Sequence, residues 1–185
     1  MEAKGSVLQS IPKFVQKRFG EDAIQQWLAR LSPEARDVYT NPIMASMWYP
    51  LIATIAEPTG VICDLFFGGD MKGAWESGRF SAEEALRGIY KIFVIVGTPQ
   101  TILKKGATAM AMLYRPSEIQ VVDLTDRHGT LRITKFPEPH RVIDARIGGF
   151  VEQSLIICGC KNLKVVPGRL MTKGDSCTEY HVTWS

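Results

Sequence analysis

The stretch that decides the fold is GGFVEQSLIICGCKNLKVVPGRLMTKGDSCTEYHVTW, residues 148–184. With the residues just before it, this stretch predicts one amphipathic helix, a glycine stop at Gly159 and a closing β-hairpin. Apolar or small side chains recur at helical spacing along one stripe: Ile143, Ile147, Phe150, Val151, Ser154, Leu155 and Cys158. Four charged residues fall outside that stripe: Arg141, Asp144, Arg146 and Glu152.

The glycine pair Gly148-Gly149 lies inside the predicted helix, where each glycine costs about 1 kcal/mol relative to alanine. A helix that carries such a pair usually lets another backbone come close at that point. After the helix, residues 163–166 predict a short strand, and Pro167-Gly168 an edge bulge. A turn at residues 173–175 then leads to the alternating strand 180–184.

A helix followed by a two-stranded ribbon needs more sheet to be stable, and we expect that sheet from earlier in the chain. Residues 119–124 and 130–136 predict two strands of a hairpin across the turn at 126–129. Helices fill the chain before residue 116. The order therefore predicts an α+β fold, an N-terminal helical bundle packed on a small antiparallel sheet of two hairpins separated by a long helix. We expect one domain over residues 1–185, with a helical part at 1–115 and a sheet-containing part at 116–185.

Several helices of the first part have recognisable boundaries. Ser32-Pro33 predicts a helix start, with the serine as N-cap and the proline at the first helical position. Residues 43–57 are apolar nearly all round and predict a buried helix bent at Pro50. The next helix is expected to end at Phe80, and Ser81 with Glu84 forms a capping-box pattern for a further helix to Val96.

The bulk composition excludes some classes of function. The chain has 185 residues, 45% of them hydrophobic, and a net charge of +3, which is too small and scattered to argue for nucleic-acid binding. No apolar run approaches the roughly 20 residues that span a bilayer. The first 20 residues carry charges throughout, unlike a secretory leader. We therefore expect a cytoplasmic protein with four free thiols and no membrane span.

The order and spacing of several short motifs resemble one superfamily over nearly the whole chain. The motifs are Gly5 with the segment from Ser10 to Gly20, Trp48-Tyr49-Pro50, Gly78-Arg79-Phe80, Tyr90-Lys91-Ile92-Phe93, Phe136-Pro137-Glu138-Pro139-His140, Gly148-Gly149-Phe150-Val151-Glu152, Lys161-Asn162 and the segment from Gly174-Asp175 to Trp184. The superfamily joins heme nitric-oxide-binding domains, four-vinyl-reductase domains and transport-protein-particle (TRAPP) subunits. Within it, the chain is most similar to a paralogous family of single-domain bacterial proteins, mostly myxobacterial.

This resemblance suggests heme as a possible cofactor, but the residues of this sequence argue against heme binding. The heme-binding branch ligates iron through one histidine and holds the propionates with a Tyr-x-Ser-x-Arg motif, which this sequence lacks. Only His128, His140 and His181 are available, and we interpret all three as structural or exposed. No cofactor is predicted.

The resemblance also raises zinc, which phenol-sensing members of the vinyl-reductase branch bind around the last hairpin. The positions that match their ligands are Pro167, Leu170 and Thr178, so the zinc pattern is missing. A three-thiolate site of Cys158, Cys160 and Cys177 stays open as an alternative. We favour the simpler interpretation, in which Cys158 packs in the core and no metal binds.

A third property of the superfamily is lipid binding, because some transport-particle subunits hold an acyl chain through a cysteine. Cys63 is the acylation candidate here, although a small buried hydrophobic residue is the more frequent role of such a cysteine. Enzymatic catalysis has little support, since no nucleophile elbow or phosphate-binding loop occurs.

The remaining feature is a surplus of aromatic and apolar side chains on the predicted helices. We expect a non-catalytic signalling module that binds a small apolar ligand between helices and sheet. The predicted ligand-binding residues are Trp75, Phe80, Tyr90, Phe93, Met110 and Tyr114. The alternative is a protein-binding adaptor or dimerising scaffold, either a homodimer through Trp48 and Tyr49 or a partner of a polarity or motility regulator. An enzyme is the third hypothesis.

Overall fold

The computed structural model describes residues 1–86 and 98–185. Its helices are α1 (Gly5–Leu8), α2 (Ser10–Phe19), α3 (Glu21–Arg30), α4 (Pro33–Thr40), the π-helix η1 (Ile52–Ala56), α5 (Glu57–Phe66), α6 (Lys72–Leu86), α8 (Pro99–Leu113), α9 (Arg141–Ile157) and the 3-10 helix η2 (Met171–Lys173). Its strands are β1 (Glu2–Lys4), β2 (Trp48–Pro50), β3 (Tyr114–Arg115), β4 (Glu118–Val122), β5 (His128–Lys135), β6 (Lys164–Pro167) and β7 (Thr178–Thr183).

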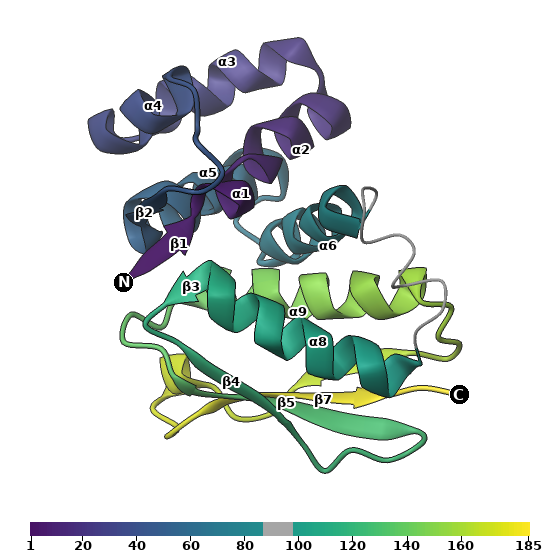
Figure 1. Ribbon diagram of the computed structural model, residues 1–185. Helices are drawn as coiled ribbons and strands as arrows, with labels where there is room; N and C mark the ends of the chain where they lie inside the picture. Colours follow the sequence, from purple (N-terminus) through teal and green to yellow (C-terminus); the bar gives the residue numbers. More distant parts are fainter. Residues whose placement is uncertain (87–97) are drawn as a thin grey trace.

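The two predicted hairpins form one antiparallel sheet of order β4-β5-β7-β6. The central pair β5–β7 sets Leu131 opposite Tyr180, and both side chains are buried. Helices α8 and α9 lie over the same face of this sheet, with α6 on their far side and α1 to α5 beyond it (Figure 1). The predicted α+β class is confirmed, and so is the long helix between two hairpins.

The predicted closing helix is α9, which starts at Arg141 and ends at Ile157. The backbone N–H of Val142 donates to Nδ1 of His140 at 3.3 Å, so the side chain of His140 caps the helix N-terminus. Gly159 follows the helix with a φ of 89°, the left-handed conformation expected at a helix stop. Ile143, Ile147 and Leu155 of the apolar stripe are buried.

Glycines bring α6 and α9 into close contact, as the pair Gly148-Gly149 predicts. A Cβ atom on Gly149 would collide with the backbone carbonyl of Trp75, and one on Gly148 with the Trp75 ring. On the facing helix, a Cβ atom on Gly78 would collide with the backbone carbonyl of Arg146. Side chains on either side of this crossing therefore meet at short range, which determines the geometry of the site.

The prediction of one bent helix over residues 43–57 was wrong in its first half. Residues Trp48–Pro50 form strand β2, which pairs with β1, and the helical segment begins only at Leu51. Pro50 cannot continue a helix behind it because it lacks the donor N–H and clashes with the preceding turn. Strand β1 also pairs with β3, so a small sheet of order β2-β1-β3 joins three distant segments.

The predicted break between Phe80 and Ser81 was also wrong, because α6 runs through both without interruption. Ser81 does not cap a helix. Its hydroxyl lies 2.6 Å from that of Ser10 and accepts a hydrogen bond from Arg146 at 2.9 Å. The cap at Ser32 is present as predicted, with its hydroxyl accepting from the Ala35 N–H at 3.2 Å.

Over the described ranges, no helix has the length and apolar character that a membrane crossing requires.

Candidate functional site

A cavity of about 760 Å³ lies between α1, α2, α6, α8 and α9, and we call it the helical cavity. Most of its wall is apolar, with contributions from residues that are distant in sequence: Val7, Leu103, Met110, Ile147, Phe150 and Leu155. Among the described residues, Leu131 is the sheet's contribution to the wall. The cavity therefore lies among helices rather than between helices and sheet, because α8 and α9 already cover the sheet face.

Arg146 lies on the wall of the helical cavity and is 3% exposed. The sequence placed it outside the apolar stripe of α9, but that side of the helix packs against α6 instead of facing solvent. Its Nη1 donates to the hydroxyl of Ser77, and its Nη2 donates to the hydroxyl of Ser81 at 2.9 Å. Burial lowers the pKa of Arg146 from its ordinary value, the direction expected for a cation removed from water.

The charge of Arg146 has no carboxylate counter-ion among the described residues. Over the ranges 1–86 and 98–185, no carboxylate lies within ion-pair distance of its guanidinium. Residues 87–97 contain neither aspartate nor glutamate, so they cannot supply one. Burying an ion in a protein interior costs several kcal/mol, and serine hydroxyls offset this only in part. Arg146 is thus an uncompensated positive charge at the wall of an apolar cavity.

Other polar groups of the wall gather near Arg146. Ser10 and Ser81 line the cavity and bond to each other, and Ser81 bonds to Arg146. Tyr114 also lines the cavity and is 7% exposed, and its hydroxyl forms no hydrogen bond within the described part of the chain. Burial raises the pKa of Tyr114, and the positive charge of Arg146 acts in the opposite direction. The hydroxyl therefore stays protonated and able to donate.

The structure separates the residues that the sequence proposed as ligand contacts. Met110 and Tyr114 line the helical cavity. Trp75 lines a different pocket, and Phe80 instead packs on Phe14 with ring centroids 5.6 Å apart. Tyr90 and Phe93 lie outside the described residues. Ligand contact by these residues stays a prediction. Arg146 was not among the site residues predicted from the sequence. The pair Gly148-Gly149, two residues further on, was the signal in α9 that another helix packs closely there.

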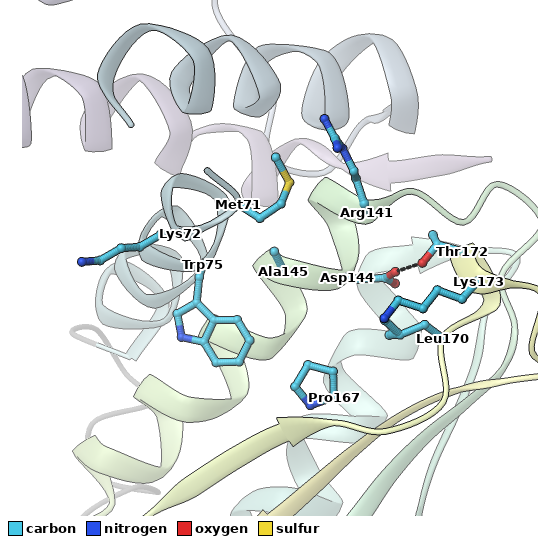
Figure 2. A pocket seen from close by; sticks show the side chains of 10 residues that line it. All are labelled: Met71, Lys72, Trp75, Arg141, Asp144, Ala145, Pro167, Leu170, Thr172 and Lys173. Carbon is cyan, nitrogen blue, oxygen red and sulfur yellow. Dashed lines mark hydrogen bonds between the residues drawn. The ribbon is translucent and has the colours of Figure 1, made fainter. Parts of the chain in front are cut away.

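Trp75 belongs to a second pocket of about 600 Å³, which we call the outer pocket (Figure 2). It lies between the first turns of α6 and α9 and the loop that follows β6, so it opens on the face of α9 opposite the helical cavity. Its charged residues are Lys72, Arg141, Asp144 and Lys173. The Thr172 hydroxyl donates to Asp144 at 2.6 Å. Burial raises the pKa of Asp144, although this hydrogen bond acts in the opposite direction.

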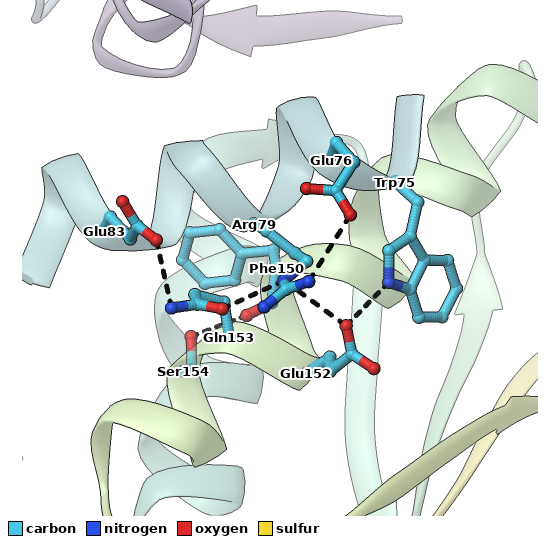
Figure 3. A network of polar contacts seen from close by, with 8 residues as sticks. All are labelled: Trp75, Glu76, Arg79, Glu83, Phe150, Glu152, Gln153 and Ser154. Atoms are coloured by element: carbon cyan, nitrogen blue, oxygen red, sulfur yellow. Dashed lines mark hydrogen bonds and ion pairs between the residues drawn. The ribbon is translucent and has the colours of Figure 1, made fainter. Parts of the chain in front are cut away.

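A second arginine, Arg79, lies at the same α6–α9 crossing, and acidic and amide groups surround it (Figure 3). Its guanidinium reaches Glu76 at 3.4 Å, Glu152 at 3.5 Å and the amide oxygen of Gln153 at 3.0 Å. The indole N–H of Trp75 donates to the same Glu152 oxygen at 2.8 Å. Two carboxylates thus face the single positive charge of Arg79, and Arg79 lines neither pocket. We interpret the network as a structural link between the two helices.

Trp48 and Tyr49, proposed as interface residues, both lie in β2. The Lys4 ammonium is 4.3 Å and the Arg115 guanidinium 4.1 Å from the centroid of the Trp48 ring. The Tyr49 hydroxyl accepts a hydrogen bond from the Met44 N–H at 3.0 Å. Both aromatic side chains therefore have intramolecular partners, and an interface role for them stays a prediction.

The cysteines lie apart from the helical cavity. Cys63 is fully buried beside Ala74 and Val142, and burial raises its pKa. It lines neither pocket, so its role as an acylation site stays a prediction without a lipid channel to support it. Cys158 and Cys160 are neighbours, and burial raises the pKa of Cys160 to about 11. In the part of the chain that the structure describes, Cys177 does not join them, and no cluster of His, Cys, Asp or Glu side chains could hold a metal ion.

Comparison with solved structures places this fold among H-NOX proteins. An H-NOX protein mutant from K. algicida, in its Fe(II) unliganded state, superimposes with a TM-score of 0.74 at 8% identity, covering 98% of this chain and 96% of that one. An H-NOX protein from S. oneidensis in the Fe(II)NO state gives 0.73 at 11% identity, covering 98% and 99%. At such identities the likeness shows a shared fold. No family model matches the chain, and no curated protein sequence matches it.

The residues of the helical cavity do not fit a heme held through a histidine. None of the three histidines in the chain lines the cavity. His140 caps α9, Nδ1 of His181 lies 3.1 Å from the Thr130 hydroxyl, and Nδ1 of His128 lies 2.9 Å from the Thr125 hydroxyl. A gas-binding heme of that kind needs its axial histidine at the cavity wall. We therefore derive no function through a heme.

Proposed function

We propose that this chain is a non-catalytic sensing module that holds a small, largely apolar ligand in the helical cavity. The observation that carries the proposal is the cavity itself. Its volume of about 760 Å³ falls within the roughly 300–1,000 Å³ typical of small-molecule sites. Its wall combines many apolar side chains with a few convergent polar groups, the composition of such sites. The fold it shares with H-NOX proteins adds support, since the S. oneidensis H-NOX protein is in the Fe(II)NO ligation state.

The position of the cavity suggests how binding would be detected. Its wall joins α1 and α2, near the start of the chain, to α6, α8 and α9. A ligand that contacts all of these elements binds the closed arrangement better than any arrangement in which they separate. Its binding energy therefore shifts the population toward the closed state, which a partner protein can recognise.

The first experiment fills the cavity with a larger side chain and measures the binding of Nile red, an uncharged, polarity-sensitive dye. Gly106 lines the cavity, and a Cβ atom at this position would meet no heavy atom of the described residues within 4 Å. Gly106→Leu therefore fills cavity space without straining the fold, and we expect it to weaken Nile red binding about tenfold or more. Fluorescence titration of the purified protein measures this loss.

Gly60→Leu is the matched control, because Gly60 also lies in a helix with no heavy atom within 4 Å of its Cβ position and lines neither pocket. Its Nile red affinity should equal that of the native chain. Equal affinity in both variants, or no dye binding to the native chain, would reject the cavity as the ligand site.

A second candidate function, a docking or dimerising module, draws on one exposed patch. Met44 and Met47 near β2 are 59% and 57% exposed, and Ile52 is 38% exposed. Exposed apolar side chains that cluster are typical of protein-binding surfaces. Under this function Trp48 and Tyr49 belong to the interface, and the Tyr49 hydroxyl accepts a hydrogen bond from the Met44 N–H. Sedimentation velocity tests it: a dimer that Met47→Lys dissociates would support the adaptor, and a monomer at all concentrations would remove self-association.

A further inference from the structure

The position of Arg146 indicates which class of ligand the helical cavity would select. Arg146 is the group on the wall that combines full charge with near-complete burial, and it has no carboxylate partner in the chain. Buried charges in proteins are ordinarily paired with an opposite charge. The missing counter-ion of Arg146 can then be supplied by a ligand.

We propose that the ligand of the helical cavity is an amphipathic monocarboxylate, an apolar body with one carboxylate that binds the guanidinium of Arg146. This inference rests on the proposed function, since it names the ligand class of the same cavity. The apolar body occupies the part of the cavity lined by residues such as Leu103, Met110 and Leu155. The carboxylate pairs with Arg146, for which the described residues offer no carboxylate partner.

The charge balance favours one negative charge on the ligand. Arg146 contributes one positive charge, and its nearest polar partners, Ser77 and Ser81, are neutral. A dianion such as a phosphate monoester would leave a negative charge unbalanced in a low-dielectric site. A carboxylate also matches the planar guanidinium, which binds it through paired N–H donors.

A second observation points to the same place. Tyr114 is 7% exposed and lines the cavity, and its hydroxyl has no hydrogen-bond partner within the described residues. Polar side-chain groups inside folded proteins mostly bond to the protein or to ordered water. A ligand carboxylate has enough lone pairs to accept from this hydroxyl and from Arg146 together. Tyr114 lacks a hydrogen-bond acceptor and Arg146 lacks a negative partner, and one ligand carboxylate would supply both.

The rim of the cavity offers a competing explanation for anion binding. Lys13 lines the cavity, but its side chain is 54% exposed and it pairs with Glu84 at 3.6 Å. An exposed ion pair in high-dielectric solvent contributes little selectivity. The buried cation is therefore the stronger candidate, and variants of Lys13 and Arg146 separate the two explanations.

The test compares decanoate with decan-1-ol as competitors that displace Nile red from the native chain and from Arg146→Met. The two competitors share a ten-carbon chain and differ in the head group. We expect the native chain to bind decanoate about tenfold or more tightly than decan-1-ol, since a hydrogen bond to a charged group is worth about that factor. Arg146→Met should lose this preference and keep its affinity for decan-1-ol within about twofold.

Two further variants test whether the preference for decanoate depends on the buried groups of the cavity. Arg79→Met makes the same change at the same helix crossing outside the cavity, and decanoate binding should stay as in the native chain. Tyr114→Phe removes one hydroxyl without changing charge, and it should weaken decanoate binding about threefold to tenfold and leave decan-1-ol unaffected. If Arg146→Met fails to fold, the Tyr114→Phe result still decides the proposal.

The possible negative results distinguish the carboxylate proposal from the proposed sensing function. Dye binding to the native chain with equal affinity for decanoate and decan-1-ol would overturn the carboxylate proposal and leave the sensing function standing. A decanoate preference lost in Lys13→Met but kept in Arg146→Met would overturn the role of Arg146. Decyl phosphate binding more tightly than decanoate would overturn the monocarboxylate class. No dye binding at all would reject the proposed function together with this inference.

Discussion

Two arginines at the crossing of α6 and α9 have opposite surroundings, although Gly78, which precedes Arg79 in the sequence, packs against the backbone of Arg146. Arg79 is one-third exposed, and Glu76, Glu152 and Gln153 surround its charge. Arg146 is almost wholly buried, with serine hydroxyls as its partners and no carboxylate. The exposed arginine thus has the counter-ions, and the buried arginine, which needs them more, has none.

This contrast distinguishes a structural charge from a binding charge. A cation that has carboxylate partners within the chain stabilises the packing of two helices and requires no ligand. A charge that the fold buries without cancelling it reduces the stability of the empty protein. Such a cost is tolerated where a ligand offsets it, which is a common property of binding sites.

The largest expected effect comes from separating the helices that carry both arginines. Gly149→Leu places a side chain against the backbone carbonyl of Trp75, so α6 and α9 must move apart. We expect the free energy of unfolding to fall by about 3 kcal/mol, the upper range for overpacking. Urea unfolding followed by circular dichroism measures it. Gly106→Leu, which meets no atom, is the control, and an equal loss in both would show that the crossing is not tight.

The next prediction tests whether the buried charge of Arg146 lowers the stability of the empty protein. Arg146→Met replaces an uncompensated buried charge with an apolar side chain of similar length, and we expect the empty protein to become more stable by about 1–2 kcal/mol. Thermal unfolding of ligand-free protein measures this change. A destabilisation of similar size would show that the serine hydroxyls alone satisfy the charge, and the contrast would then disappear.

Arg79→Met should change stability in the opposite direction and by less. The substitution leaves Glu152 beside Glu76 without the cation between them, and we expect a loss of about 1 kcal/mol. The loss should shrink as salt is added, because Arg79 and its partners are partly exposed and solvent ions screen them. Unfolding at low and high ionic strength measures it. A salt-independent loss would point to lost packing instead.

The smallest prediction concerns Asp144, a third charge of the same helix region, in the outer pocket. Burial raises the pKa of Asp144, so the folded state holds its proton more tightly than the unfolded state. Its contribution to stability is therefore greatest below the unfolded pKa of about 4 and declines as pH rises toward the folded value. After solvent screening we expect less than about 1 kcal/mol.

The variant Asp144→Asn should lack this decline. Its unfolding temperature relative to that of the native chain should increase between about pH 4 and pH 7. Differential scanning calorimetry across this range measures the difference, and other carboxyl groups cancel because both proteins carry them. A constant difference would mean that Asp144 titrates alike in both states.

Sequence periodicity predicted the regular part of this molecule well. The apolar stripe located α9, alternation located β7, and the pair Gly148-Gly149 predicted the close approach of another helix. These features depend on neighbours in sequence, or on one packing face, and such patterns are visible in a single chain. The short strands β1 and β2 were missed because three residues carry no period, and distant partners stabilise them.

The candidate site was less predictable, for a related reason. The stripe of α9 indicates one apolar face, but α9 packs on both sides, and nothing in its own sequence says that Arg146 faces a second helix. Ser81 resembled a helix cap because its local spacing to Glu84 is that of a capping box. Its actual partners are Ser10 and Arg146, which are 71 and 65 positions away, and only the tertiary fold brings them together.

The small sheet β2-β1-β3 has a consequence for the order of folding. Glu2 pairs with Pro50 on one side and with Arg115 on the other, so β1 closes a short loop and a much longer one. Pairing at greater separation is slower, because more chain entropy is lost before the contacts form. Strand β3 directly follows α8, which forms one wall of the helical cavity. During synthesis the N-terminal helices can therefore assemble early, and we expect the cavity to close only at a late, slow step.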